Sequence, residues 1–186
     1  MDMDNMMNEM GGAFMVAWLA GGMDDLGGAL VLAAAWMAIS GAHILPVITW
    51  GHIMTGDLGD TDAWTDNGSR LVAQMVGAIL ALMLMGEGSH TAAAAPDMWS
   101  FDLWATLTAV GAGALLWTVY DRCDAWVTAF VVMAMAGTLS LGGAADMGGA
   151  LIGGGDDMAA SAVAWIMDGL WVGVGALVAT KVPDML

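Results

Sequence analysis

One carboxylic acid lies inside the last apolar stretch of the chain. Asp168 is the eighth residue of Ser161–Lys181, a stretch of 21 residues that carries no other charge before the only lysine of the sequence. An acid in mid-bilayer costs about 2.5–3.5 kcal/mol on insertion scales, and such acids typically face a bundle interior on an ion or proton path. At 1.5 Å per residue, Asp168 is expected roughly 10–12 Å along this helix, in its outer third. Asp168 is therefore a pathway candidate; the alternative is an acid near the outer interface, hydrated or bonded to a neighbouring Ser or Thr.

His43 is the second pathway candidate, because it lies deep in the long apolar run 26–54. A neutral imidazole there could pair with a carboxylic acid, bind a metal or ligate haem. His52 follows nine residues later, about half a turn out of phase on a regular helix, so we do not expect a same-face pair. A bis-histidine haem would then need His43 with His90, which is predicted in an external loop, or a histidine from a partner chain. The alternative for His43 is a core histidine that donates to a backbone carbonyl freed by Pro46.

The beginning of the chain is rich in thioethers, which are soft ligands that suit Cu(I). The methionines concerned are Met1, Met3, Met6, Met7 and Met10. In composition this tail resembles the methionine-rich external tails of copper-uptake proteins, but methionine occurs 19 times in the chain, so the local excess is modest. We expect no cofactor, with copper and haem as alternatives.

Motifs of the common enzyme classes are absent from the sequence. There is no phosphate-cradling glycine motif, nucleophile elbow, zinc-protease helix or dinucleotide fingerprint. The acidic loop 57–66 does not have the spacing of a helix–loop–helix calcium site, so we expect it to be a solvated loop. The single cysteine, Cys123, excludes an intramolecular disulfide. We therefore do not predict an enzyme.

The composition indicates a membrane protein that must position these groups. Hydrophobic residues make up 59% of the chain and charged residues 12%, against about 25% charged in a typical soluble domain. Apolar runs of about 20 residues match a hydrocarbon core of roughly 30 Å. We predict an all-α, polytopic transmembrane helical bundle that forms a single integral membrane domain over residues 1–186. Five spans are expected, at about 27–51, 70–87, 101–120, 125–141 and 161–181.

A shorter apolar segment, residues 10–23, precedes these spans and either re-enters the membrane, lies at its interface, or crosses it as a short tilted helix. Pro46 should kink the first span or end its regular part. If the spans alternate, Arg70, Arg122 and Lys181 all fall on one side, which the positive-inside tendency makes cytoplasmic.

Small residues recur at four-residue spacing on several predicted spans, which places them on one helix face. Inside lipid, such faces associate by close van der Waals packing. The residues concerned are Ala73, Gly77, Ala81, Ala105, Ala109, Gly113, Gly169 and Gly173. The same chemistry would serve contacts between copies of the chain.

The acidic balance limits the partners. With 19 acids against 3 bases, the net charge is −16, which excludes a nucleic-acid footprint and a polybasic membrane patch. The composition resembles the acidic style of halophilic archaeal proteins, in which salt screens the repulsion; codon bias in a GC-rich genome is the alternative.

Two functional classes follow from these features. The first is a small permease or channel-like bundle for an ion or small solute, with Asp168 and His43 on its pathway. The second is a non-catalytic structural subunit of a membrane complex or of a viral or cellular envelope. Both predict the lipid bilayer as surroundings, with homo-oligomer or membrane-complex partners.

Overall fold

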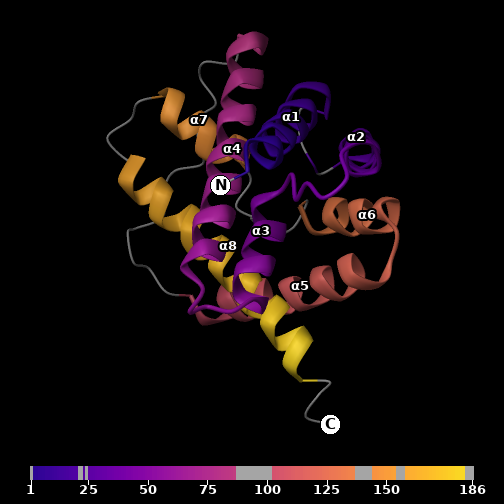
Figure 1. The fold of residues 1–186 in the computed structure, drawn as a ribbon, viewed down its shortest axis with the longest axis vertical. Coiled ribbons are helices and arrows are strands. Elements are labelled where there is room, and N and C mark those ends of the chain that lie inside the picture. The colour runs from indigo at the N-terminus through magenta and orange to yellow at the C-terminus, as the bar shows by residue number, and fades with distance from the viewer. Residues whose placement is uncertain are drawn as a thin grey trace.

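The computed structural model describes residues 2–20, 23, 25–86, 102–136, 144–153 and 158–182, and every regular element within these ranges is an α-helix (Figure 1). The predicted all-α class is confirmed to that extent. In chain order the helices are α1 (Met3–Ala20), α2 (Leu26–Ala38), α3 (Pro46–Thr55), α4 (Thr61–Met85), α5 (Leu103–Arg122), α6 (Ala125–Ala136), α7 (Ala144–Gly153) and α8 (Met158–Lys181).

Three of the described helices, α4, α5 and α8, are long and apolar enough to cross a membrane. They correspond to the predicted spans at 70–87, 101–120 and 161–181, and they suggest a membrane protein. Helices α2 and α6 are apolar but shorter. For the predicted span at 125–141, the structure describes only the 12-residue helix α6, and residues 137–143 lie outside the described part. Five spans are therefore not confirmed.

The predicted single span at 27–51 is wrong, because the chain leaves the helix between α2 and α3. Pro46 is the first residue of α3, and Leu45 before it is extended, with φ −107° and ψ 136°. A proline disfavours the helical conformation for the residue that precedes it, and its missing N–H suits a helix start. Gly41 and Ile44 have positive φ values of 79° and 65°, so residues 39–45 form an irregular break and not a simple kink.

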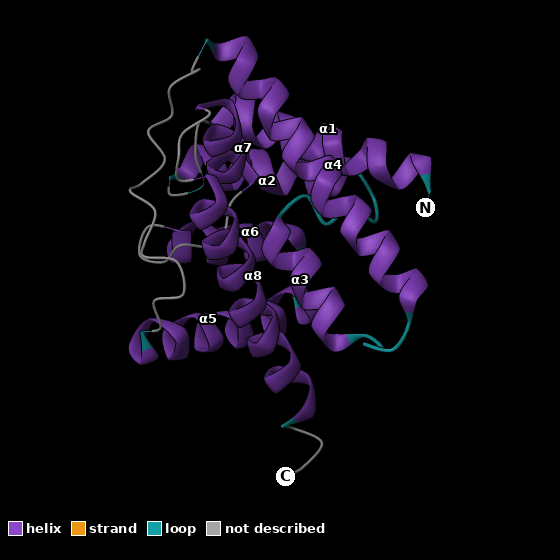
Figure 2. Ribbon diagram, turned by 90° about the vertical axis from the view of Figure 1, so that its left-hand side faces the viewer, coloured by secondary structure: helices purple, strands orange, loops and turns teal. Residues whose placement is uncertain are grey.

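Helix α1 includes both the polar tail and much of the apolar segment predicted at 10–23. It has 18 residues and packs along α4 (Figure 2). A Cβ at Gly77 would clash with the backbone of Met10, so glycine permits the close approach of the two helices. Much of the segment predicted at 10–23 is therefore part of a longer helix, and whether it crosses, re-enters or lies along a membrane stays a prediction.

Three acids begin helices, and of these only Asp60 belongs to the acidic loop 57–66 that was predicted to be solvated. Asp25, Asp60 and Asp102 are the N-caps of α2, α4 and α5, and each side chain accepts a backbone N–H of the first turn. Because α4 begins at Thr61, the second half of the acidic loop 57–66 is helical.

The packing of α3, α5 and α8 relies on glycine. A Cβ at Gly113 would meet the backbone of Val172, and one at Gly169 or Gly173 would meet Trp50. Helices α5 and α6 run across the view of Figure 1, whereas α4 follows its long axis, so these helices do not form a simple up-and-down bundle. A hydrophobic core that includes Leu32, Ile48, Leu116 and Val132 joins α2, α3, α5 and α6 beside the break.

Candidate functional site

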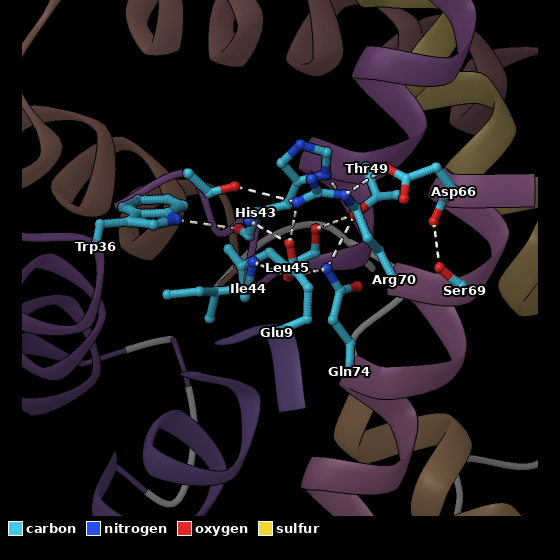
Figure 3. Close-up of polar contacts among 11 residues, drawn as sticks. Glu9, Trp36, His43, Ile44, Leu45, Thr49, Asp66, Ser69, Arg70 and Gln74 are labelled. Carbon is cyan, nitrogen blue, oxygen red and sulfur yellow. Dashed lines mark hydrogen bonds and ion pairs between the residues drawn. The ribbon is translucent and has the colours of Figure 1, made fainter. Parts of the chain in front are cut away.

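A buried group of polar side chains lies at the break between α2 and α3 (Figure 3). We call Glu9, His43, Thr49, Arg70 and Gln74 the polar centre. Glu9, Thr49 and Gln74 are 0% exposed and His43 is 7% exposed. They come from α1, the break, α3 and α4, so segments far apart in the sequence build the site.

The Glu9 carboxylate is the hub of the polar centre. Its Oε1 accepts hydrogen bonds from the His43 backbone N–H at 2.7 Å and from Arg70 Nη1 at 2.8 Å. Its Oε2 accepts from the Ile44 backbone N–H at 2.6 Å and from Gln74 Nε2 at 2.8 Å. A buried carboxylate is stable when charged and polar donors surround it in this way.

The break in the helix explains why a carboxylate is needed there. Leaving the helix frees the N–H groups of His43 and Ile44, and buried N–H groups must find acceptors. The positive φ of Ile44 places successive N–H groups in the concave arrangement that binds anions. Glu9 satisfies both N–H groups at once and thereby fixes α1 on the break.

Arg70 provides the balancing charge. Besides its ion pair with Glu9, it donates through Nη1 to the Gly41 carbonyl at 3.1 Å and through Nε to Asp66 at 3.2 Å. Arg70 lies within α4 and not at its end, and its side chain, which is 11% exposed, lies at the edge of the polar centre. Arg70 was expected at the start of a span, whereas α4 begins at Thr61, and the predicted cytoplasmic side of Arg70, Arg122 and Lys181 stays a prediction.

Thr49 connects the carboxylate to His43. Gln74 Nε2 donates to Thr49 Oγ1 at 2.9 Å, and Thr49 Oγ1 lies 3.1 Å from His43 Nδ1. His43 was expected to donate to a backbone carbonyl freed by Pro46; its Nδ1 instead contacts this hydroxyl, and its own carbonyl accepts from Trp36 Nε1 at 3.0 Å. When Thr49 donates its proton to Nδ1, the imidazole proton lies on Nε2.

The rings of His43 and His52 are stacked, although a regular helix would hold them about half a turn apart. Their ring centroids lie 4.1 Å apart with an angle of 2° between the planes. The expectation assumed one regular helix, whereas the break between α2 and α3 turns the chain so that the His52 ring stacks on the His43 ring. Trp117 and Tyr120 meet the His52 ring edge-on, at centroid distances of 5.0 and 5.9 Å. Together these rings extend the site from the polar centre towards α5.

Two polar atoms near the centre have no hydrogen-bond partner within the described part of the chain. They are Gln74 Oε1 and His52 Nε2, and both are buried. Most buried polar atoms in proteins are paired, so each such atom is a potential contact for a bound molecule.

A pocket of about 250 Å³ lies beside the rings. It is lined by Trp36, Ile39, Gly41, Ala42, Tyr120, Cys123, Ala125 and Thr128. Trp36 connects it to the polar centre through the bond to the His43 carbonyl, and Tyr120 through its contact with the His52 ring.

Asp168 lies on α8, partly buried, next to Gly169, which contacts the Trp50 indole. Because α8 begins at Met158, Asp168 is about 15 Å from the first residue of its helix and nearer the middle than the predicted outer third. Its role in a pathway stays a prediction.

Four of the five candidate copper ligands lie on α1, and Met1 lies outside the described residues. Met3, Met6, Met7 and Met10 are three or four residues apart and share one side of the helix. Copper binding stays a prediction. No group of three His, Cys, Asp or Glu side chains suited to a metal occurs in the described part, and His90 lies outside it.

The predicted packing residues differ in their surroundings. Ala73 and Ala81 are buried, Ala109 is partly buried, and Ala105 is exposed. Gly77, Gly113, Gly169 and Gly173 all lie against a neighbouring helix, as described above.

Sequence reasoning missed Glu9, Thr49, Arg70 and Gln74 as site residues. Two signals were present: Glu9 is one of two glutamates in an aspartate-rich chain, and Arg70 precedes Gln74 by one helical turn within an otherwise apolar segment. Neither signal identifies the partners, which come from distant parts of the chain. Comparison with known protein families and with curated proteins finds no match to this chain.

Proposed function

We propose that the chain is a small integral membrane permease or channel-like protein for an ion or small solute, with a pathway that passes the break between α2 and α3. The observation that carries the proposal is the irregular segment 39–45 between α2 and α3, of which residues 42–44 are buried and which is joined to an ion pair. At membrane depth, irregular backbone is tolerated only inside protein or along a cavity. Interrupted helices of this kind hold substrate and ion sites in many transporters.

The unpaired polar atoms support a path through the rings. A solute or proton carrier in the pocket at Trp36 and Tyr120 would next meet His52, then His43 and Thr49. His52 Nε2 and Gln74 Oε1 offer a donor or acceptor along that line. His43 is one of the two pathway candidates predicted from the sequence.

Asp168 is a second element of the proposal. It lies on α8, where Gly169 and Gly173 let α8 approach α3 at Trp50. A carboxylic acid there would serve an ion that passes along α8.

A structural subunit is the alternative, and a specific observation favours it. Large apolar side chains are exposed on α4 and α5, for example Leu84 at 69% and Trp104 at 77%. Lipid or a partner subunit would cover them. In this case the only role of the polar centre is to hold α1 against the segment 39–45.

Flux in liposomes tests the proposal. The purified protein is reconstituted with a trapped pH-sensitive dye, and proton entry is driven by a potassium gradient with valinomycin. Thr49→Val removes the hydroxyl between His43 and Gln74 while keeping the shape of the side chain, and Thr65→Val is the matched control on the exposed side of α4.

We expect flux above that of protein-free liposomes, at least tenfold slower in Thr49→Val and in Asp168→Asn, and unchanged in Thr65→Val. Flux equal to that of empty liposomes, or equal in all variants, would refute the permease. A protein without flux that purifies only with partners or as an array supports the subunit.

A further inference from the structure

We infer that the His43–Ile44 turn, Arg70 and Gln74 form a binding site for a carboxylate group, which Glu9 occupies as a tethered ligand. A free carboxylate such as formate or acetate fills the site when the Glu9 side chain is shortened. This inference goes beyond the proposed function and does not depend on it, because it rests only on the donors around Glu9 (Figure 3).

The donor geometry selects a planar anion with two oxygens. Each oxygen of Glu9 receives one backbone N–H and one side-chain N–H, at distances between 2.6 and 2.8 Å. A carboxylate presents two oxygens with lone pairs for four such bonds. A halide ion offers a single centre and cannot meet both pairs of donors at these distances.

The donors are held in place without help from α1. The guanidinium of Arg70 is fixed by Asp66 and by the Gly41 carbonyl, and Gln74 by Thr49. Trp36 holds the His43 carbonyl, and Pro46 limits the conformation of the residue before it. The site should therefore keep its shape when Glu9 is replaced, and a preorganised site binds without the cost of ordering its donors.

The space that the Glu9 side chain fills is also suited to a small carboxylate. Glu9 is 0% exposed, so truncating it beyond Cβ leaves an enclosed space lined by polar donors. Acetate matches the carboxylate and the methylene group that the truncation removes, and formate matches the carboxylate alone. The positive charge of Arg70 loses its closest partner in this variant, which adds an electrostatic attraction for an anion.

Thermal unfolding of Glu9→Ala in detergent tests the inference, with tryptophan fluorescence as the signal. Sodium formate and sodium acetate are titrated at constant ionic strength against sodium chloride. Glu9→Gln is the matched control, because its amide still fills the space. We expect formate to raise the Tm of Glu9→Ala in a saturable manner by about 5–10 °C at a concentration of about 100 times its dissociation constant. The wild-type protein and Glu9→Gln should respond to formate as they do to chloride.

A formate response in Glu9→Ala no larger than the chloride response overturns the inference. If Glu9→Ala does not fold in chloride, it is refolded in formate, alongside Glu9→Ser, whose hydroxyl keeps one acceptor at the turn. Folding in formate but not in chloride supports the site. Failure of both variants to fold in formate counts against it.

Discussion

Arg70→Met is the substitution that tests the polar centre most directly. Methionine keeps the length and much of the apolar stem of the arginine side chain but removes the charge and its hydrogen-bond donors. Glu9, which is 0% exposed, then remains as a buried carboxylate with two backbone N–H groups and Gln74 as its donors, and without a counter-ion.

The expected cost follows from burial. Removing one partner of a buried ion pair typically costs about 3–5 kcal/mol, whereas an exposed pair contributes about 0–1 kcal/mol. Arg70 is 11% exposed, so water reaches the edge of the pair and the lower end of the range applies. We expect a loss of about 3 kcal/mol, which is roughly a hundredfold change in the folded-to-unfolded ratio. The pair of Arg70 with Asp66, which is 36% exposed, belongs to the weak class.

Equilibrium unfolding in mixed detergent micelles with increasing dodecyl sulfate measures these free energies. Asp66→Asn is the control, since it removes only the exposed partner and should change stability by less than about 1 kcal/mol. Combining Arg70→Met with Glu9→Gln should cost less than the sum of the single substitutions, by about 1–3 kcal/mol, because no uncompensated charge remains.

Two results would refute the reasoning. The first is a loss for Arg70→Met as small as that for Asp66→Asn, which would mean that Glu9 is not held as a buried ion. The second is strict additivity in the double variant, which would mean that Glu9 and Arg70 do not interact.

Three further predictions concern the rest of the chain. Gly113→Ala should lower the free energy of unfolding by about 1–3 kcal/mol, because its methyl group would meet the Val172 backbone. Gly111→Ala should raise it by about 0.5–1 kcal/mol, because the added carbon meets open space. The dodecyl sulfate titration described above compares the two variants. Cys123, exposed and next to Arg122, should react with a membrane-impermeant maleimide only after cells are lysed, and labelling of intact cells would contradict the cytoplasmic side. With a net charge of −16, the Tm should rise from low to molar KCl, and a flat salt profile would argue against a halophilic protein.

Local features of the sequence determined the helical class and the longest apolar helices. The helices α4, α5 and α8 overlap predicted spans, although α4 begins earlier than expected, because length and hydropathy are properties of a contiguous segment. Pro46 was expected to kink the span or end its regular part; the helix instead ends at Ala38, and Pro46 begins α3, since proline acts on its own residue and the one before it.

Only the tertiary structure decided the polar centre. Glu9 meets its donors across sequence separations of 34 to 65 residues, and no local pattern encodes such a meeting. Once a distant carboxylate satisfies the N–H groups of His43 and Ile44, a helix break that would otherwise be costly becomes stable. The same break stacks His43 on His52, which a regular helix would have kept apart. The sequence by itself determined the helical class and the longest apolar helices, and the tertiary structure determined which polar groups meet, because buried charges are stable only where distant partners converge.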